Sequence, residues 1–108
     1  MKRGDLVVIA LQGDYGKPRP ALVVQAALFA DHPSLTVAPV TSTIVDAPLF
    51  RVTVEPTAEN GLRSVSQIMV DKLTTIRRER IAQTLGSLPE DLMLRVNRAL
   101  VLWLGIAA

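Results

Sequence analysis

An arginine held between two prolines is the side chain best suited to chemistry in this sequence. Arg19 lies between Pro18 and Pro20, directly before the apolar run 21–24. Each proline fixes its own φ and biases the residue before it towards extended backbone, so this arginine has little conformational freedom. A guanidinium is planar, permanently charged and able to hold two phosphate oxygens at once. Arg19 is therefore either suited to stabilising a phosphodiester transition state or a surface residue in a turn shaped by proline.

A cluster of hydroxyl groups ends the next apolar run. Residues 35–43 read as a strand that finishes with Thr41, Ser42 and Thr43. Strand alternation places Thr41 and Thr43 on one face and Ser42 on the other. Hydroxyl residues in strands commonly reflect β-propensity alone. If this strand lies beside the one that Arg19 begins, however, Thr41 comes next to a guanidinium and becomes a candidate for phosphodiester chemistry.

Two further features are suited to nucleic acid, although each also has a purely structural interpretation. The glycine-containing loop 12–17 carries Tyr15, on which a base could stack, and Lys17, which could contact a phosphate. The same loop could be a solvated turn, and it lacks the glycine and lysine spacing of a P-loop. Gln67 could contact a base edge or an active-site water, or it could complete an edge strand.

Composition excludes several classes of site. The chain contains no cysteine, which rules out disulfides, thiolate zinc sites and cysteine nucleophiles. The single histidine, His32, precedes Pro33 with no second ligand nearby, so we expect neither a metal site nor a cofactor. The net charge of +2 is too small to argue for nucleic-acid binding by itself. The basic run 72–80 is more typical of a solvated helix start than of a binding surface.

Length and hydropathy indicate one globular domain that spans residues 1–108. Hydrophobic residues make up 49% of the chain and aromatic residues only 4%, which predicts an aliphatic core. No apolar run reaches the roughly 18 residues of a membrane span. Lys2 and Arg3 resemble the start of a signal peptide, but the apolar run 6–11 that follows is too short for one. We therefore expect a cytoplasmic protein with no membrane partner.

The first part of the chain has the period of strands. Strands are predicted at residues 4–11, 19–25, 35–43, 51–54, 64–70 and 72–76. Asn60-Gly61 predicts a tight turn between two of them. Consecutive strands joined by short loops favour antiparallel pairing.

The last part of the chain has the period of helices. A short helix is predicted at residues 78–85, and an amphipathic helix at 88–104 begins with an S-x-x-E capping box at 87–90. These elements predict an α+β fold, a small and strongly bent antiparallel β-barrel with short helices and a C-terminal amphipathic helix packed on it. Residues 99–108 carry no charge, which favours burial or a homodimer interface.

Taken in order, these segments resemble the MazF/PemK family of toxin endoribonucleases. The resemblance extends over nearly the whole chain and ends with the amphipathic helix. The matching motifs are RGDLV at 3–7, KPRPALVV at 17–24, V-x-P-x-TST at 37–43 and SVSQIMVDKL at 64–73. It implies an SH3-like barrel of the CcdB/MazF type, a homodimer with RNA-binding grooves, and metal-independent cleavage of single-stranded RNA at short sequences.

The resemblance also assigns roles to the candidate residues. Arg19 falls on the family's catalytic arginine and Thr41 on its catalytic threonine, while the substrate's own 2′-OH attacks the adjacent phosphate. Threonine and arginine are poor acid–base groups at neutral pH, so turnover should be modest. The expected partners are an acidic antitoxin of the MazE/PemI type that competes with RNA, and DNA only indirectly through the antitoxin complex. The residues expected to contact RNA are Tyr15, Lys17, Ser42, Thr43 and Gln67.

Two departures leave other functions open. Some relatives place an acidic residue directly before the glutamine, whereas this chain has Ser66, and the loop 13–17 is shorter than in many relatives. CcdB toxins share this fold, poison DNA gyrase by binding, and end in Trp-Gly-Ile, which the segment 103–106 resembles. Trp103 also fits the apolar stripe of the helix, and the pairing of Arg19 with Thr41 favours the nuclease. A non-catalytic SH3-like binding module would require both residues to be incidental.

Overall fold

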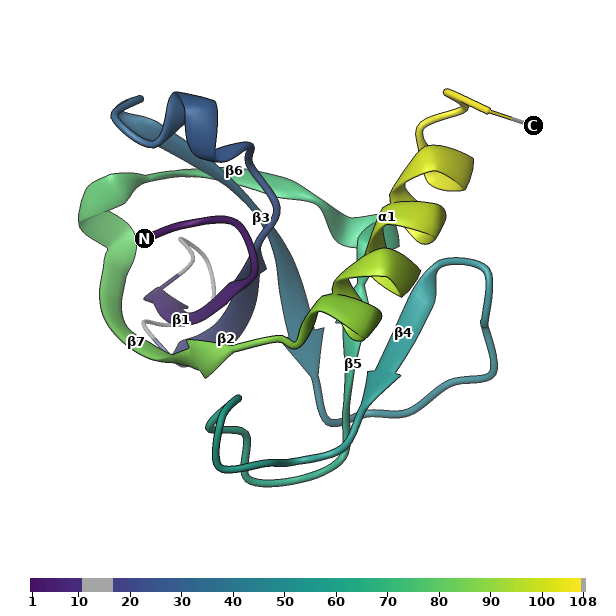
Figure 1. Ribbon diagram of the computed structural model, residues 1–108. Helices are drawn as coiled ribbons and strands as arrows, with labels where there is room; N and C mark the ends of the chain where they lie inside the picture. The colour runs from purple at the N-terminus through teal and green to yellow at the C-terminus, as the bar shows by residue number, and fades with distance from the viewer. Residues whose placement is uncertain (11–16, 108) are drawn as a thin grey trace.

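In the part of the chain that the structure describes, an antiparallel sheet of seven strands and one C-terminal α-helix make up the fold (Figure 1). The structure is a computed structural model, which describes residues 1–10 and 17–107. In chain order the elements are β1 (Asp5–Ala10), β2 (Pro18–Val23), η1 (Ala27–Phe29), β3 (Ser34–Thr41), β4 (Arg51–Val54), β5 (Ser66–Met69), η2 (Val70–Lys72), β6 (Thr74–Arg77), η3 (Arg78–Arg80), β7 (Ile81–Ser87) and α1 (Glu90–Trp103).

Strand β3 organises the sheet because it pairs with three other strands. The strand order is β4-β5-β3-β2-β1-β7, and β6 pairs with the first half of β3. The last two residues of β3 pair instead with β5. Strands β5 and β4 pair with each other and form a separate part of the sheet beneath α1, which we call the β4–β5 wing (Figure 1). The α+β fold predicted from the sequence is confirmed. The bent sheet is not a closed barrel, because the described outer strands β4 and β7 do not pair with each other.

Alternating side chains fill two separate apolar clusters on the two faces of the sheet. Leu6 and Leu22 belong to the cluster that α1 covers with Val96, whereas their neighbours Val7 and Val23 belong to the second cluster inside the bend. Successive strand residues point to opposite faces, so both sides of β1 and β2 are buried. The fold is therefore held together by an aliphatic core, as the low aromatic content predicts.

The prediction of a helix at residues 78–85 is wrong. Only the single 3-10 turn η3 forms there, and Ile81–Ser87 continues as β7 along the free edge of β1. Two register irregularities, between Leu6 and Val7 and between Val8 and Ile9, bend this pairing. An unpaired edge of β1 would leave backbone N–H and C=O groups without partners. Pairing with β7 provides these hydrogen bonds, and their contribution outweighs the weak helical preference of residues 78–85.

The C-terminal helix is confirmed, although its start differs from the predicted capping box. Helix α1 begins at Glu90 with Pro89 as its N-cap and has no capping hydrogen bond from a side chain. Ser87 cannot serve as the cap because it ends β7, where its N–H donates to the Glu59 carbonyl at 2.9 Å. Proline at the helix entrance carries no N–H that would need a partner. None of the described helices is long and apolar enough to cross a membrane.

A glycine ends α1 and explains the segment 103–106. Gly105 has a φ of +71°, the left-handed conformation that favours glycine after a helix. The N–H of Ile106 donates to the Val101 carbonyl at 3.0 Å, the hydrogen bond of a Schellman motif. Trp103 is about half exposed, at 48%, and packs against Phe50 with 5.5 Å between ring centroids. Helix termination therefore accounts for the glycine of the Trp-Leu-Gly-Ile sequence.

Candidate active site

The proline-flanked arginine and the threonine lie at neighbouring strand ends. Arg19 is the second residue of β2, pairs with Ile9 of β1, and is exposed. Thr41 is the last residue of β3. The β2–β3 register aligns Ala21 with Pro39, and continuing it by two residues would place Arg19 level with Thr41. Residues opposite each other in an antiparallel pair project to the same side of the sheet, so this register favours the proximity expected from the sequence.

The Thr41 hydroxyl is oriented by its own chain. Its Oγ1 accepts a hydrogen bond from the N–H of Thr43 at 3.1 Å. One lone pair of the oxygen is therefore occupied, while the hydroxyl proton is free to be donated elsewhere. A hydroxyl held in this way can donate to a phosphate oxygen. Ser42 and Thr43 follow on the surface, with exposed side chains.

Of the two loop residues expected to contact nucleic acid, the structure describes one. Lys17 is exposed and directly precedes β2, two positions before Arg19. Both cations therefore lie at the same end of β2. Tyr15 lies outside the described residues. Within the described chain, no group of histidine, aspartate and glutamate side chains is arranged to hold a metal ion.

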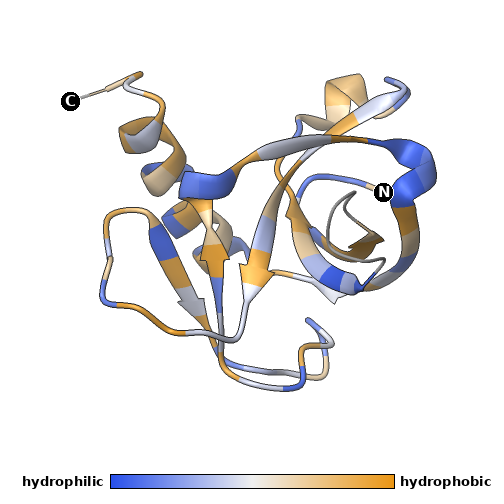
Figure 2. Ribbon diagram, turned by 180° about the vertical axis from the view of Figure 1, so that it is seen from behind, coloured by the Kyte–Doolittle hydropathy of each residue, from blue (hydrophilic) through white to orange (hydrophobic). Residues whose placement is uncertain are grey.

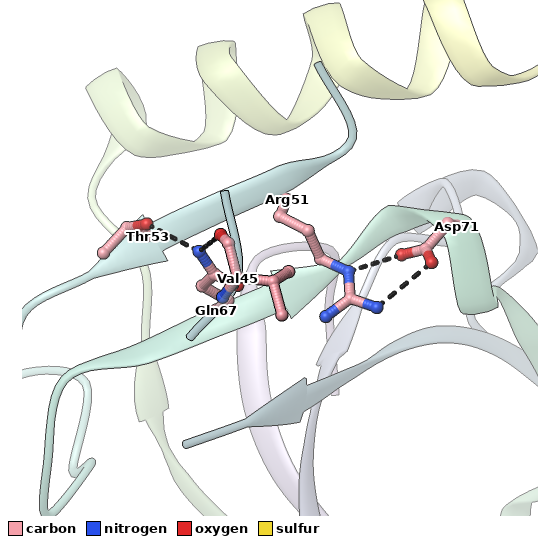
Figure 3. Close-up of polar contacts among 5 residues, drawn as sticks. All are labelled: Val45, Arg51, Thr53, Gln67 and Asp71. Carbon is pink, nitrogen blue, oxygen red and sulfur yellow. Dashed lines mark hydrogen bonds and ion pairs between the residues drawn. The ribbon is translucent and has the colours of Figure 1, made fainter. Parts of the chain in front are cut away.

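Gln67 occupies an interior position, which differs from the RNA contact predicted for it. The side chain is only 3% exposed. Its Oε1 accepts from the Val45 N–H at 3.1 Å, and its Nε2 donates to the Val45 carbonyl at 2.9 Å and to the Thr53 hydroxyl at 3.2 Å (Figure 3). The amide group is thus fully engaged inside the protein. In this conformation only a small part of Gln67 is accessible from outside the protein.

Ser66 does not replace the carboxylate that some relatives carry. Its side chain is buried, and its Oγ donates to the Ser64 carbonyl at 2.9 Å. The hydroxyl therefore stabilises the entrance to β5. Because the Ser66 hydroxyl already donates its proton in this hydrogen bond, the structure gives it no role in proton transfer to RNA.

An ion pair next to Gln67 was not anticipated from the sequence. Arg51, the first residue of β4, donates from Nε and Nη2 to the two carboxylate oxygens of Asp71 in η2 at 2.7 and 3.1 Å (Figure 3). The two side chains are 12% and 15% exposed. Sequence gives no signal for this pair, because the residues are far apart in the chain and meet only when β4 pairs with β5. The contact between Gln67 and the Val45 main chain is equally invisible in the sequence.

The chain matches a known protein family over nearly its whole length. Residues 2–104 match the model of the PemK-like, MazF-like toxins of type II toxin-antitoxin systems. The chain belongs to this family.

Individual MazF relatives agree in sequence and fold. The chain is 46% identical over 108 residues to a probable endoribonuclease MazF of Mycolicibacterium smegmatis, covering 99% of each protein. A MazE–MazF structure from Deinococcus radiodurans matches with a TM-score of 0.77 and 30% identity, covering 99% of this chain and 97% of the other. A mycobacterial endoribonuclease in complex with its cognate antitoxin matches with a TM-score of 0.85 over 100% of this chain and 98% of the other. Its identity is 20%, so that likeness concerns the fold.

Membership in the MazF family favours the nuclease over the gyrase poison. The family match covers both Arg19 and Thr41, and the most similar sequence described above is named as an endoribonuclease. The Trp-Leu-Gly-Ile segment, which suggested CcdB, forms an ordinary helix end. A purely binding SH3-like module is likewise not favoured.

Proposed function

We propose that this chain is the toxin of a type II toxin–antitoxin system, an endoribonuclease that cleaves single-stranded RNA, including mRNA, at short specific sequences. Cleavage of mRNA in the cytoplasm would inhibit translation and growth. Family membership supports this function, and so does the relative named as a probable endoribonuclease. The observation that carries it in this structure is the location of Arg19 and Thr41 at the ends of adjacent strands.

The reaction needs no nucleophile from the protein and no metal. The 2′-oxygen of the RNA attacks the adjacent phosphorus, the new O2′–P bond forms, and the P–O5′ bond breaks. The 2′-hydroxyl loses its proton to solvent water and the departing O5′ gains one from water, which leaves a cyclic phosphate and a 5′-OH. The protein's part is orientation and stabilisation of the charge that builds on the phosphate oxygens.

Arg19 and Thr41 together orient the phosphate and stabilise its charge. The guanidinium of Arg19 binds two phosphate oxygens and stabilises their developing charge. The Thr41 hydroxyl donates a hydrogen bond to another oxygen of the same phosphate, and the bond that its oxygen accepts from the N–H of Thr43 holds it in place. Exposed Lys17, Ser42 and Thr43 would contact the flanking RNA, and Tyr15 would stack on a base.

Two protein partners belong to the proposal. An acidic, flexible antitoxin of the MazE type would cover the cations Lys17 and Arg19 and compete with RNA, and DNA would be contacted only through that complex. Structures of relatives are described as MazE–MazF and as a toxin with its cognate antitoxin, which supports this partner. A second copy of the chain would cover the exposed apolar side chains at the end of α1, namely Leu102, Leu104 and Ile106.

Substitution of Arg19 tests the proposed activity. Arg19→Ala removes the charge that stabilises the transition state and should lower the single-turnover cleavage rate by about 100-fold or more. The matched control is Arg77→Ala. Arg77 is also an exposed strand arginine, but it pairs with Ser34 at the opposite end of β3, so cleavage should persist. Mapping the 5′ ends of RNA cut by the wild-type protein identifies the cleaved sequence for both assays.

Other outcomes would contradict the proposal. Wild-type cleavage rates in Arg19→Ala would remove Arg19 from the reaction. Cleavage of an oligonucleotide with a 2′-deoxy sugar at the cut position would rule out attack by the 2′-oxygen. Sedimentation of the wild type and both variants as the same dimer would show that any loss of activity is not caused by a loss of assembly.

A further inference from the structure

The amide of Gln67 pairs with the main chain of Val45 as one strand pairs with another. It accepts the Val45 N–H and donates to the Val45 carbonyl, so both polar groups of one peptide position are bound by one side chain (Figure 3). A third hydrogen bond links Nε2 to the Thr53 hydroxyl on β4. A buried amide whose oxygen and nitrogen are both engaged is held in one rotamer.

The segment bound in this way directly follows the candidate catalytic threonine. Thr41 is paired with Gln67 across β3 and β5, and the chain leaves the sheet after Thr41. Residues 42–46 belong to no strand, and their side chains are exposed. Among the described residues, Gln67 supplies the hydrogen bonds that join this segment to the β4–β5 wing. The other bond in the segment, from the Thr43 N–H to the Thr41 hydroxyl, is local.

We propose that Gln67 is a positioning residue that holds the segment 42–46 and thereby orients the Thr41 hydroxyl towards the RNA phosphate. This inference rests on the proposed ribonuclease function. It replaces the direct RNA contact predicted for Gln67 with an indirect role, exerted through Val45. When the Val45 contact is lost, the Thr43 N–H moves, and with it the hydrogen bond that keeps the Thr41 proton directed at substrate.

Glutamine is the side chain that this role requires. Glutamate would keep an acceptor for the Val45 N–H, but its second oxygen would face the Val45 carbonyl and repel it. Asparagine has the same amide on a shorter stem and would not span the distance from β5. Methionine has similar length and volume but offers neither hydrogen bond. The segment 42–46 lies on the surface and belongs to no strand, so it can shift until water solvates the freed groups of Val45. The expected result is therefore a mobile segment and not an unfolded protein.

The first test measures the segment itself, without RNA. Hydrogen exchange of the Val45 amide, followed by NMR on the wild-type protein, should show protection. Gln67→Met should speed this exchange by about 10-fold or more, because the Val45 amide then has no hydrogen-bond partner that holds it closed. Gln67→Glu provides a second variant that conserves the shape and part of the contact. Thr53→Val is the matched control, since it removes only the third hydrogen bond and leaves the Val45 contact in place.

The second test separates positioning from binding. Affinity is measured with an RNA that carries 2′-O-methyl groups and cannot be cleaved, and chemistry with the single-turnover rate on unmodified RNA. In Gln67→Met the rate should fall about 10- to 100-fold, as expected when a reacting group is misplaced. The affinity should change by much less, roughly threefold or under, because the side chain is buried.

Each contrary outcome overturns the inference in a distinct way. Unchanged Val45 exchange in both Gln67 variants would show that the contact does not hold the segment. A larger loss of RNA affinity than of rate would make Gln67 an RNA ligand. Fast Val45 exchange with a wild-type cleavage rate would show that the segment does not orient Thr41. If the wild-type protein cuts no RNA, the proposed function fails, while the exchange measurement still decides whether Gln67 holds the segment.

Discussion

Replacing Asp71 by asparagine is expected to lower the free energy of unfolding by about 2 kcal/mol. The carboxylate of Asp71 accepts two parallel hydrogen bonds from Arg51, at 2.7 and 3.1 Å. Asparagine keeps the shape and one acceptor but turns an NH₂ group towards the guanidinium. The substitution therefore leaves a mostly covered cation without a counter-charge.

The magnitude follows from how far the two charges are removed from water. Exposed ion pairs contribute about 0.2–1 kcal/mol, and breaking a fully buried pair costs about 3–5 kcal/mol. The side chains of Arg51 and Asp71 are 12% and 15% exposed, nearer to the buried limit, but water still reaches them. About 2 kcal/mol for the single change corresponds to a roughly 30-fold shift of the folding equilibrium. In urea the midpoint should fall by about 1 M.

The assay is a double-mutant cycle in urea. Asp71→Asn, Arg51→Met and the double variant are unfolded at one protein concentration, because the stability of a dimer depends on concentration. The coupling energy between the two positions should be about 1.5 kcal/mol. Asp31→Asn is the control, since Asp31 is exposed in the turn before β3, and its stability should stay within about 0.5 kcal/mol of the wild type.

Salt decides between a desolvated pair and a surface pair. Dissolved salt screens exposed charges strongly and covered charges weakly. Adding NaCl to about 1 M should therefore lower the coupling energy by less than about half. A coupling energy below about 0.5 kcal/mol in low salt would refute the reasoning. Such a value would mean that the hydrogen-bond distances of Arg51 and Asp71 say little about stability.

Two further predictions concern the packing that carries the site. Gly86→Ala should destabilise the protein by about 3 kcal/mol or prevent folding, because its Cβ would lie 2.0 Å from the Glu59 carbonyl oxygen. A Cβ at Gly105 would meet no atom within 4 Å, so Gly105→Ala should cost only about 1 kcal/mol, from the positive φ. Equal losses of stability for the two glycine variants in urea unfolding would contradict this reasoning. Val96→Ala, at a fully buried position, should cost about 2 kcal/mol and exposed Leu94→Ala under about 0.5 kcal/mol, measured by thermal unfolding.

The sequence predicted strands and the long helix well where local and tertiary preferences agree. Residues 51–54 form a strand with the predicted bounds, and α1 lies within the predicted 88–104. Both segments have a clear apolar period, and each buries the face that its period indicates. The prediction failed at 78–85, where the local pattern is ambiguous. The edge of β1 needed a partner there, and only the folded sheet contains that information.

The candidate site shows the same division. Arg19 and Thr41 could be selected from the sequence because their chemistry is carried by residue type and by the prolines around the arginine. Gln67 could be selected but not interpreted, since an amide that could contact RNA could also hold a loop. Its partner is the main chain of Val45, which any residue except proline would present in the same way.

The sequence by itself therefore determined the types of group available for chemistry, the aliphatic core and the family. These depend on side-chain identity and on short-range periodicity, which can be read directly from the amino-acid sequence. Tertiary structure alone decided that the sheet stays open, that residues 81–87 form β7, that Ser66 and Gln67 are buried, and that Arg51 meets Asp71. Those outcomes depend on which strand edges find partners, a competition among groups distant in sequence that no local pattern records.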